Sequence, residues 1–186
     1  MALEHAILVS LSEQSGSGYE LARRFDKSIG FFWSATHQQI YRVLKRMDDA
    51  GWVKGESIAQ DGRPDKKVYR VSSAGRAELA RWIAEPTEPG HLRNELAVKI
   101  RGASYGDMAS LLAEVRRHRD EHAARLDLYR RIEQHDFPES RPRSGSALHQ
   151  YLVLRGGVRV EQGFVDWCDE VLDALTREAD SEPPQP

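Results

Sequence analysis

Apolar residues recur at helical spacing in several separate segments of the first half of the chain, with polar residues between them. The positions predicted to face a core are Leu3, Ile7, Leu8 and Leu11, then Leu21, Ala22, Phe25 and Ile29, then Ile40, Val43, Leu44 and Met47, and finally Leu79, Trp82 and Ile83. Each group fits one face of an amphipathic helix. The pattern therefore predicts four short helices before residue 85.

Two of these helices carry start signals. Ser17 and Glu20, and again Thr36 and Gln39, have the spacing of a capping box, in which the first side chain accepts from a backbone N–H group at the helix start and the second reaches back. The third helix is therefore expected to begin directly after Thr36. Gly51 is expected to end it, because glycine often follows the last turn of a helix.

A hairpin is predicted between the third and fourth helices. The run from Trp52 to Ala59 can form a strand, 61–65 a turn, and Lys67 to Val71 a returning strand. The order helix, helix, helix, hairpin, helix is that of a winged helix-turn-helix. The fold class expected is therefore mainly α with a small β-hairpin.

The second half of the chain follows a break at 85–90, which contains two prolines and a glycine. Beyond it, two long helices are expected, separated by residues 135–146. On the first, apolar and histidine positions recur near a period of 3.5 residues, as in a helix that packs lengthwise on another: Leu111, Leu112, Val115, His118, His122, Leu126, Tyr129 and Ile132. On the second, the core candidates are Leu148, Tyr151, Leu152, Phe164, Trp167, Cys168, Val171, Leu172 and Leu175. The predicted domains are 1–88, a winged helix-turn-helix, and 89–180, a helical domain for dimerisation and effector binding, with a disordered tail at 181–186.

Three features of this second half allow more than one interpretation. Gly156 and Gly157 interrupt the last helix and suggest either a kink or a close backbone approach. His118 and His122, four residues apart, could face one metal ion, but no third ligand is evident, which favours a place in the helix seam. Cys168 shares a stripe with apolar residues and is expected to be a buried small hydrophobe.

Charge is distributed unevenly along the 186 residues. The whole chain has 27 Lys plus Arg and 29 Asp plus Glu, a net charge of −2. Residues 37–76 carry nine basic and five acidic side chains, a net of +4, so the remainder sums to −6. A basic segment of this kind is the electrostatic footprint expected of a nucleic-acid-binding surface.

The third helix offers suitable chemistry on the face opposite its apolar stripe. A shift of about 200° around the helix reaches Gln38, Tyr41, Arg42 and Lys45, none of which is aliphatic. In the major groove, Gln can pair with adenine edges and Arg with guanine. The backbone N–H groups near Thr36 and His37 can hold a phosphate oxygen.

Other classes of function find little support. No dinucleotide fingerprint, nucleophile elbow or phosphate loop is present, so no enzyme, cofactor or metal is expected. The longest apolar run near the N-terminus is too short for a signal or membrane segment, which predicts a cytoplasmic protein without membrane association. The remaining alternative is a winged-helix module that binds another protein and not DNA.

Several segments together resemble the PadR family of transcriptional regulators. They are Ser17 to Leu21, Phe32 to Leu44, Gly62 to Tyr69, Ser73 to Gly75, Asn94 to Lys99 and Leu154 to Gly156, in the order of the family. The resemblance covers the first 100 residues well and the second half loosely, and it is closest to the longer members with a C-terminal helical domain. The aromatic-His-Gln-x-Ile-Tyr segment combined with the Gly-Arg-Pro-Asp-Lys-Lys wing is a specific combination.

The resemblance implies which residues face DNA. Thr36, His37, Gln38, Tyr41 and Arg42 would do so from the third helix, beside Lys45 of the same polar face, and Arg63, Lys66 and Lys67 from the wing. Thr36 stands where many relatives have Ser, and Arg42 where many have Pro. These departures bear on which operator sequence is bound.

The resemblance also implies a homodimer formed by the C-terminal helices, and a repressor. A dimer can bind a palindromic operator with half-sites about 34 Å apart. In some relatives a small molecule binds near the junction of the two domains and lowers DNA affinity. Arg155, Arg159 and Trp167 are the candidates for such a site, with a small aromatic effector as the ligand.

Overall fold

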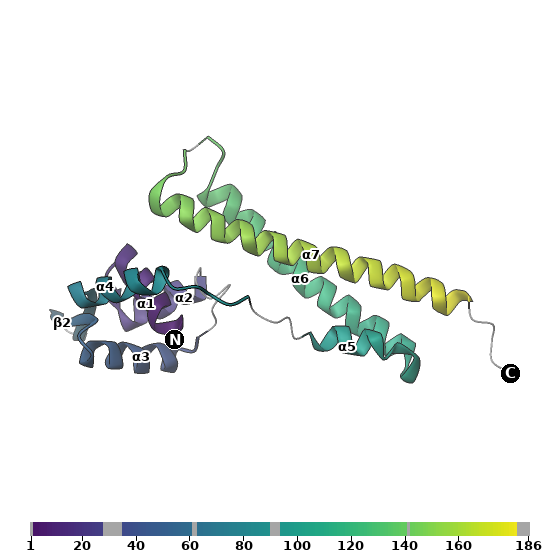
Figure 1. The fold of residues 1–186 in the computed structure, drawn as a ribbon, viewed down its shortest axis with the longest axis horizontal. Helices are drawn as coiled ribbons and strands as arrows, with labels where there is room; N and C mark the ends of the chain where they lie inside the picture. Colours follow the sequence, from purple (N-terminus) through teal and green to yellow (C-terminus); the bar gives the residue numbers. More distant parts are fainter. Residues whose placement is uncertain (1, 28–34, 61–62, 90–93, 141, 182–186) are drawn as a thin grey trace. The chain divides into compact units, whose positions relative to one another are not determined.

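The computed structural model describes residues 2–27, 35–60, 63–89, 94–140 and 142–181. It divides into two compact units, Met1–Pro89 and Gly90–Pro186 (Figure 1). Within the described residues, no helix is long and apolar enough to cross a membrane.

The N-terminal unit is a winged helix-turn-helix. Its elements are α1 (Ala2–Glu13), β1 (Gly16–Ser17), α2 (Gly18–Lys27), α3 (His37–Asp49), β2 (Val53–Gln60), β3 (Arg63–Val71) and α4 (Ser73–Ile83). The predicted fold class is thus confirmed, and the predicted hairpin is present. The returning strand is longer than predicted, because residues 63–65 belong to β3 and not to a turn, while 61–62 lie outside the described residues.

The strand β1 was not predicted. Gly16 and Ser17 pair antiparallel with Tyr69 and Val68, so the sheet has the order β1-β3-β2. Two residues are too few to show a period of their own, and their pairing depends on β3, which lies about 50 residues away in the sequence. This short strand ties the start of α2 to the wing.

The core of this unit joins α1, α2 and α3. Its fully buried side chains include Ile7, Leu8, Leu21, Phe25, Ile40, Leu44 and Met47. These positions agree with the predicted apolar faces, whereas Ile29 lies outside the described residues. Ile83, predicted to face inward, is 67% exposed, because it is the last residue of α4 and the neighbouring elements do not cover that end.

The C-terminal unit is built on two long helices. It contains α5 (Glu95–Arg101), the 3-10 turn η2 (Ala103–Tyr105), α6 (Met108–Asp136) and α7 (Gly145–Ser181), and α6 packs lengthwise on α7 (Figure 1). The buried contacts come from Leu112, Val115, Leu126 and Tyr129 on α6 and from Leu154, Val158, Val165 and Cys168 on α7. Residues 182–186 of the predicted tail lie outside the described residues.

The buried face of α7 differs in part from the predicted one. Leu152 is 58% exposed, and Leu154, Val158 and Val165 were missed as core positions. The helix is also continuous through its glycine pair. Gly157 lies against the ring of Tyr129, which a Cβ atom would approach to 3.0 Å, whereas a Cβ at Gly156 would meet nothing within 4 Å, so the close approach that the sequence offered as one interpretation is found at Gly157 alone.

His122 of α6 lies in the helix seam, whereas His118 contacts Glu114 and Arg117 of its own helix. His122 Nδ1 is 2.5 Å from Glu161 Oε2 of α7, and its ring stacks on Phe164 with 4.4 Å between centroids. Among the described residues, no group of three or more potential ligands could hold a metal ion. Cys168 is fully buried, as predicted, and burial raises the pKa of its thiol.

Candidate nucleic-acid interface

The helix α3 presents one apolar and one polar face, and its start is fixed by the predicted capping box. The Gln39 backbone N–H donates to Thr36 Oγ1 at 3.2 Å, and the Thr36 N–H donates to Gln39 Oε1 at 2.8 Å. The stripe from Ile40 to Met47 is buried in the core, so the opposite face is turned to solvent. On that face His37, Gln38, Tyr41, Arg42 and Lys45 are all exposed.

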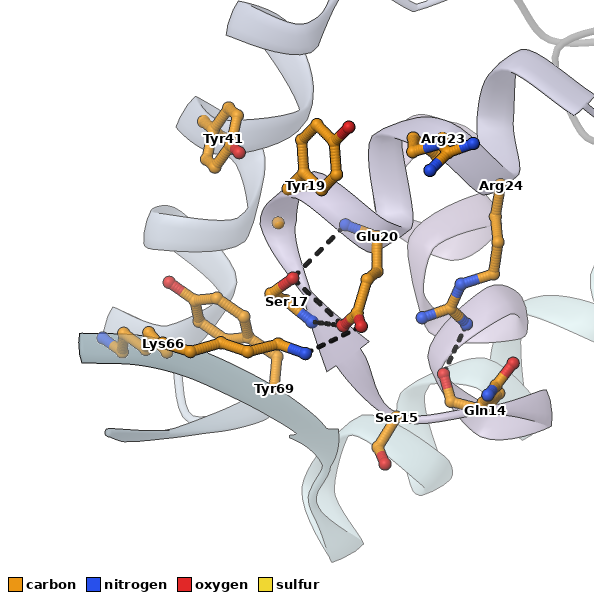
Figure 2. Close-up of a pocket in the computed structure, with 12 residues that line it drawn as sticks. Gln14, Ser15, Ser17, Tyr19, Glu20, Arg23, Arg24, Tyr41, Lys66 and Tyr69 are labelled. Atoms are coloured by element: carbon orange, nitrogen blue, oxygen red, sulfur yellow. Dashed lines mark hydrogen bonds and ion pairs between the residues drawn. The ribbon is translucent and has the colours of Figure 1, made fainter. Parts of the chain in front are cut away.

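An open pocket of about 790 Å³ lies beside α3. Its walls come from the start of α2, from Tyr41 of α3 and from Lys66, Lys67 and Tyr69 of β3 (Figure 2). An added Cβ at Gly18 would overlap the Tyr41 ring, so a side chain there would require the ring to move. The pocket therefore lies where the helix-turn-helix and the wing meet.

Exposed groups at the start of α2 extend this surface. Tyr19 is 58% exposed and Tyr41 49%, and Figure 2 shows both beside the same pocket, with Arg23 next to Tyr19. Tyr41, Lys66 and Lys67 of this lining were predicted as site residues, whereas Tyr19 and Arg23 were missed, although the capping signal at Ser17 marked the helix start. Phenol, guanidinium and backbone N–H groups are all donors that can contact phosphate oxygens.

Two lysines of the wing are held by carboxylates of neighbouring elements. Lys66 Nζ is 2.7 Å from Glu20 Oε1 on α2, and Lys67 Nζ is 2.7 Å from Asp48 Oδ2 on α3. The hydrogen bond from Lys66, followed by that from the Ser17 backbone, lowers the pKa of Glu20 to about 2. The hydrogen bond between Lys67 and Asp48 lowers the pKa of the Asp48 carboxyl and raises that of the Lys67 ammonium. Both carboxylates are therefore ionised at neutral pH.

Other cations near α3 and the hairpin are exposed without such partners. Arg42, Lys45, Lys54 and Arg70 make no ion pair within the described residues. Lys54 and Arg70 are directly opposite each other on β2 and β3. Like charges placed side by side repel each other. An anion bound near them would relieve that repulsion.

The structure thus brings most of the predicted DNA-facing residues to adjoining elements. His37, Gln38, Tyr41, Arg42 and Lys45 come from α3, Thr36 caps that helix, and Lys66 and Lys67 come from β3. Arg63 is the first residue of β3, but its side chain lies outside the described part of the chain.

The three candidate effector residues do not form one site. Arg155 Nη1 is 3.1 Å from Glu133 Oε1, and Arg159 is exposed. Trp167 packs against the buried cluster of Leu96, Val115 and Cys168. Because α7 rises about 1.5 Å per residue, Arg155 and Trp167 are roughly 18 Å apart along the helix.

A hollow of about 390 Å³ lies elsewhere in the C-terminal unit. It is formed by α5, α6 and Phe164 of α7, and its polar lining includes Lys99, Arg117 and His118. These three groups all lie within 3.5 Å of the Glu114 carboxylate. Lys99 also pairs with Glu95 and Arg117 with Glu121, so both side chains already have carboxylate partners within the protein.

Comparison with known protein families divides the chain in a similar way. Residues 7–81 match the model of the "Transcriptional regulator PadR-like family", and residues 92–176 match "Virulence activator alpha C-term". The chain is 57% identical over 185 residues to the "Probable transcriptional regulator Rv1176c" of Mycobacterium tuberculosis, covering 94% of this chain and 98% of that protein.

Two further relatives have solved structures. Bacillus subtilis PadR, named a negative transcriptional regulator, is 28% identical over 183 residues, covering 95% of this chain and 98% of that protein. Its crystal structure in complex with operator DNA has a TM-score of 0.84 to this chain, with 26% identity over 94% of this chain and 99% of that one. The Vibrio cholerae virulence activator AphA has a TM-score of 0.79 and 30% identity, over 95% of this chain and 99% of that one.

These relatives are transcriptional regulators and not enzymes, which confirms the expectation that the chain has no catalytic role. The fold, the position of the wing and the similarity along both halves agree with the resemblance noted in the sequence. The chain belongs to the PadR-like family of transcriptional regulators.

Proposed function

We propose that this regulator binds double-stranded DNA sequence-specifically through the polar face of α3 and the β2-β3 wing. The observation that carries the proposal is the exposure of His37, Gln38, Tyr41, Arg42 and Lys45 on one face of a capped helix whose other face is buried. The crystal structure of B. subtilis PadR in complex with operator DNA supports it. The α3 helix would enter the major groove.

The side chains suggest separate roles in that complex. Gln38 and Arg42 would contact base edges, because an amide can pair with adenine and a guanidinium with guanine. Thr36, His37, Tyr41 and Lys45 would hold phosphates on either side of the groove. Arg63, Lys66 and Lys67 would contact the backbone or the minor groove from the wing.

A homodimer bound to a palindromic operator completes this proposal. In the single chain, α7 exposes Leu152, Val153 and Val160 at 58%, 44% and 56%. Their spacing places them within about 100° of the helix circumference, as a continuous apolar strip. Burial of this strip against a second copy would stabilise a dimer, and two-fold symmetry would present two copies of α3 to two half-sites.

We further propose that residues 1–88 bind DNA while 89–180 dimerise and receive an effector. Repression in the cytoplasm is the mode we favour, since B. subtilis PadR is named a negative regulator, although AphA is named an activator. The crystal structure of B. subtilis PadR with p-coumaric acid supports a small aromatic ligand. Of the proposed effector residues, Arg155 and Arg159, about one helical turn apart on α7, would bind the carboxylate of such a ligand, and Trp167, about 12 Å beyond Arg159 along the helix, would bind an aromatic ring only at a separate site.

A salt titration separates this function from that of a protein-interaction module. The affinity for a labelled mixed-sequence duplex should fall with salt at a log–log slope of about −0.9 per phosphate contact. Arg42→Ala with Lys45→Ala should weaken binding and make the slope shallower. A chain that binds no duplex at low salt would overturn the proposal and favour the protein-interaction alternative.

A further inference from the structure

Two carboxylates lie inside the proposed DNA-binding surface, where they are unfavourable neighbours for phosphates. Glu20 belongs to the first turn of α2 and Asp48 to the last turn of α3. Each is within 2.7 Å of a wing lysine, Lys66 or Lys67. Figure 2 shows the Lys66 ammonium directed toward Glu20 across the pocket.

The backbone hydrogen bonds of both carboxylates do not require a negative charge. Glu20 accepts a hydrogen bond from the Ser17 backbone N–H at 2.9 Å, and Asp48 accepts one from the Gly55 N–H at 3.2 Å. A neutral amide oxygen can accept both bonds. A neutral side chain would therefore suffice for these hydrogen bonds. The negative charge of each carboxylate acts on its wing lysine.

We propose that Glu20 and Asp48 are built-in competitors of the DNA phosphates, which occupy Lys66 and Lys67 in the free protein and limit its affinity for any duplex. The inference rests on the proposed function of this surface. When DNA approaches, each lysine either exchanges a carboxylate for a phosphate or shares its donors between them. A lysine that contacts a phosphate releases a counterion from the DNA. If that lysine leaves a carboxylate behind, the carboxylate attracts a cation from solution, so fewer counterions are released in total than when an unpaired lysine makes the contact.

This competition limits binding that does not depend on sequence. Contacts to phosphates are the same on every duplex, whereas contacts from Gln38 or Arg42 to bases depend on sequence. A surface whose wing lysines are already neutralised therefore relies more on the α3 contacts. The exposed cations without ion pairs on the same surface, Arg42 and Lys45, keep their full electrostatic contribution.

The test compares the wild type with Glu20→Gln and Asp48→Asn, which keep the backbone hydrogen bonds and remove the charge. Binding of a mixed-sequence 40-base-pair duplex is measured by fluorescence anisotropy between about 50 and 300 mM salt. Each variant should steepen the log–log salt slope by about 0.9 and raise affinity about fivefold at 0.15 M salt, the effect of one added phosphate contact. Unfolding midpoints confirm that each variant is folded.

Glu56→Gln is the matched control. Glu56 is exposed on the same hairpin and makes no ion pair within the described residues, so its neutralisation should leave the slope within about 0.3 of the wild type. In a Lys66→Gln background, Glu20→Gln should lose its effect, because its competition acts through Lys66.

Three results would overturn the inference while leaving the proposed function intact. They are an equal effect of Glu56→Gln and Glu20→Gln, an undiminished effect of Glu20→Gln in the Lys66→Gln background, and unchanged or weaker DNA binding by Glu20→Gln. If the wild type binds no duplex at 50 mM salt, the proposed function fails and the inference fails with it.

Discussion

Individual residues at the helix starts determine how the DNA-binding surface is presented. The Thr36 hydroxyl caps α3 by accepting a hydrogen bond from the Gln39 backbone N–H, and the Gln39 side-chain oxygen accepts one from the Thr36 backbone N–H. Because the buried and exposed faces of α3 both depend on where its first turn begins, this cap sets the orientation of Gln38, Tyr41 and Arg42 as a group. The cap was predictable from the sequence because it depends only on residues three apart.

Removal of the cap should destabilise the N-terminal unit. Thr36→Ala should lower the free energy of unfolding by about 1 kcal/mol, because the Gln39 N–H loses its acceptor, whereas Thr36→Ser keeps a hydroxyl and should cost far less. Urea unfolding followed by circular dichroism measures both. Equal losses in the two variants would show that the methyl group, and not the cap, matters.

Gly75 occupies a position in α4 that no side chain can fill. An added Cβ would overlap the carbonyl oxygen of Trp52, which belongs to the backbone and cannot swing aside. Gly75→Ala should therefore lower the free energy of unfolding by about 1–3 kcal/mol. At Gly106 a Cβ would meet nothing within 4 Å, so Gly106→Ala is the control and should change stability by less than about 0.5 kcal/mol.

Glu78 makes the stability of the N-terminal unit depend on pH in the acidic range. Its hydrogen bonds with Arg81 and then with His5 lower its pKa to about 2 from the ordinary 4.5. A carboxyl whose pKa is lower in the folded state stabilises the fold above the unfolded pKa and loses that contribution as the pH falls. The unfolding midpoint should therefore decrease between about pH 5 and pH 2.

The variant Glu78→Gln isolates this contribution. It should unfold at a lower temperature than the wild type at pH 7, with the difference shrinking toward pH 2. Glu56→Gln, which removes a carboxylate without an ion pair among the described residues, should follow the wild-type curve. A constant gap between Glu78→Gln and the wild type at every pH would contradict the assignment.

At the scale of elements, the sequence predicts well what repeats locally and poorly what depends on distant partners. The amphipathic helices of the N-terminal unit and the hairpin were predicted, because periodicity and turn residues are local signals. The strand β1 exists through pairing with β3. The inner face of α7 was misassigned at Leu152 because apolar residues cover more than one side of that helix, and only packing on α6 selects Leu154 and Val158.

The short helix α5 shows how such packing acts. It has seven residues, too few to be stable alone, and Leu96 fixes it to the cluster of Val115 and Cys168. Leu96→Ala should cost about 2–4 kcal/mol and increase hydrogen exchange throughout α5. Val98 is 71% exposed, so Val98→Ala is the control and should leave that exchange unchanged. Equal exchange in both variants would exclude Leu96 as the anchor.

At the scale of the whole molecule, the proposed dimer depends on the apolar strip of α7. Val153→Glu with Val160→Glu places two charges in a surface that we expect to be buried between copies, and should weaken dimerisation at least 100-fold. Sedimentation equilibrium measures this. Ala147→Glu adds a charge to an exposed part of the same helix outside the strip and should leave the dimer intact. A double variant as dimeric as the wild type would locate the interface elsewhere.

The net charge of −2 conceals the asymmetry on which DNA binding would depend. Residues 37–76 carry +4, and the structure places that charge on α3 and the hairpin. The positions of the cations could be predicted from the sequence, but their partners could not. Glu20 is 46 residues away from Lys66 in the chain, and no local pattern indicates that the two side chains meet.

Selection of bound duplexes from a random pool tests the central claim most directly. The wild type should enrich a palindrome with two half-sites about one helical turn apart, because two copies of α3 would contact the major groove on one side of the duplex. Gln38→Ala should change the base preference within each half-site, while Lys67→Ala should weaken binding to all sequences similarly. Enrichment of no sequence by the wild type would contradict the account.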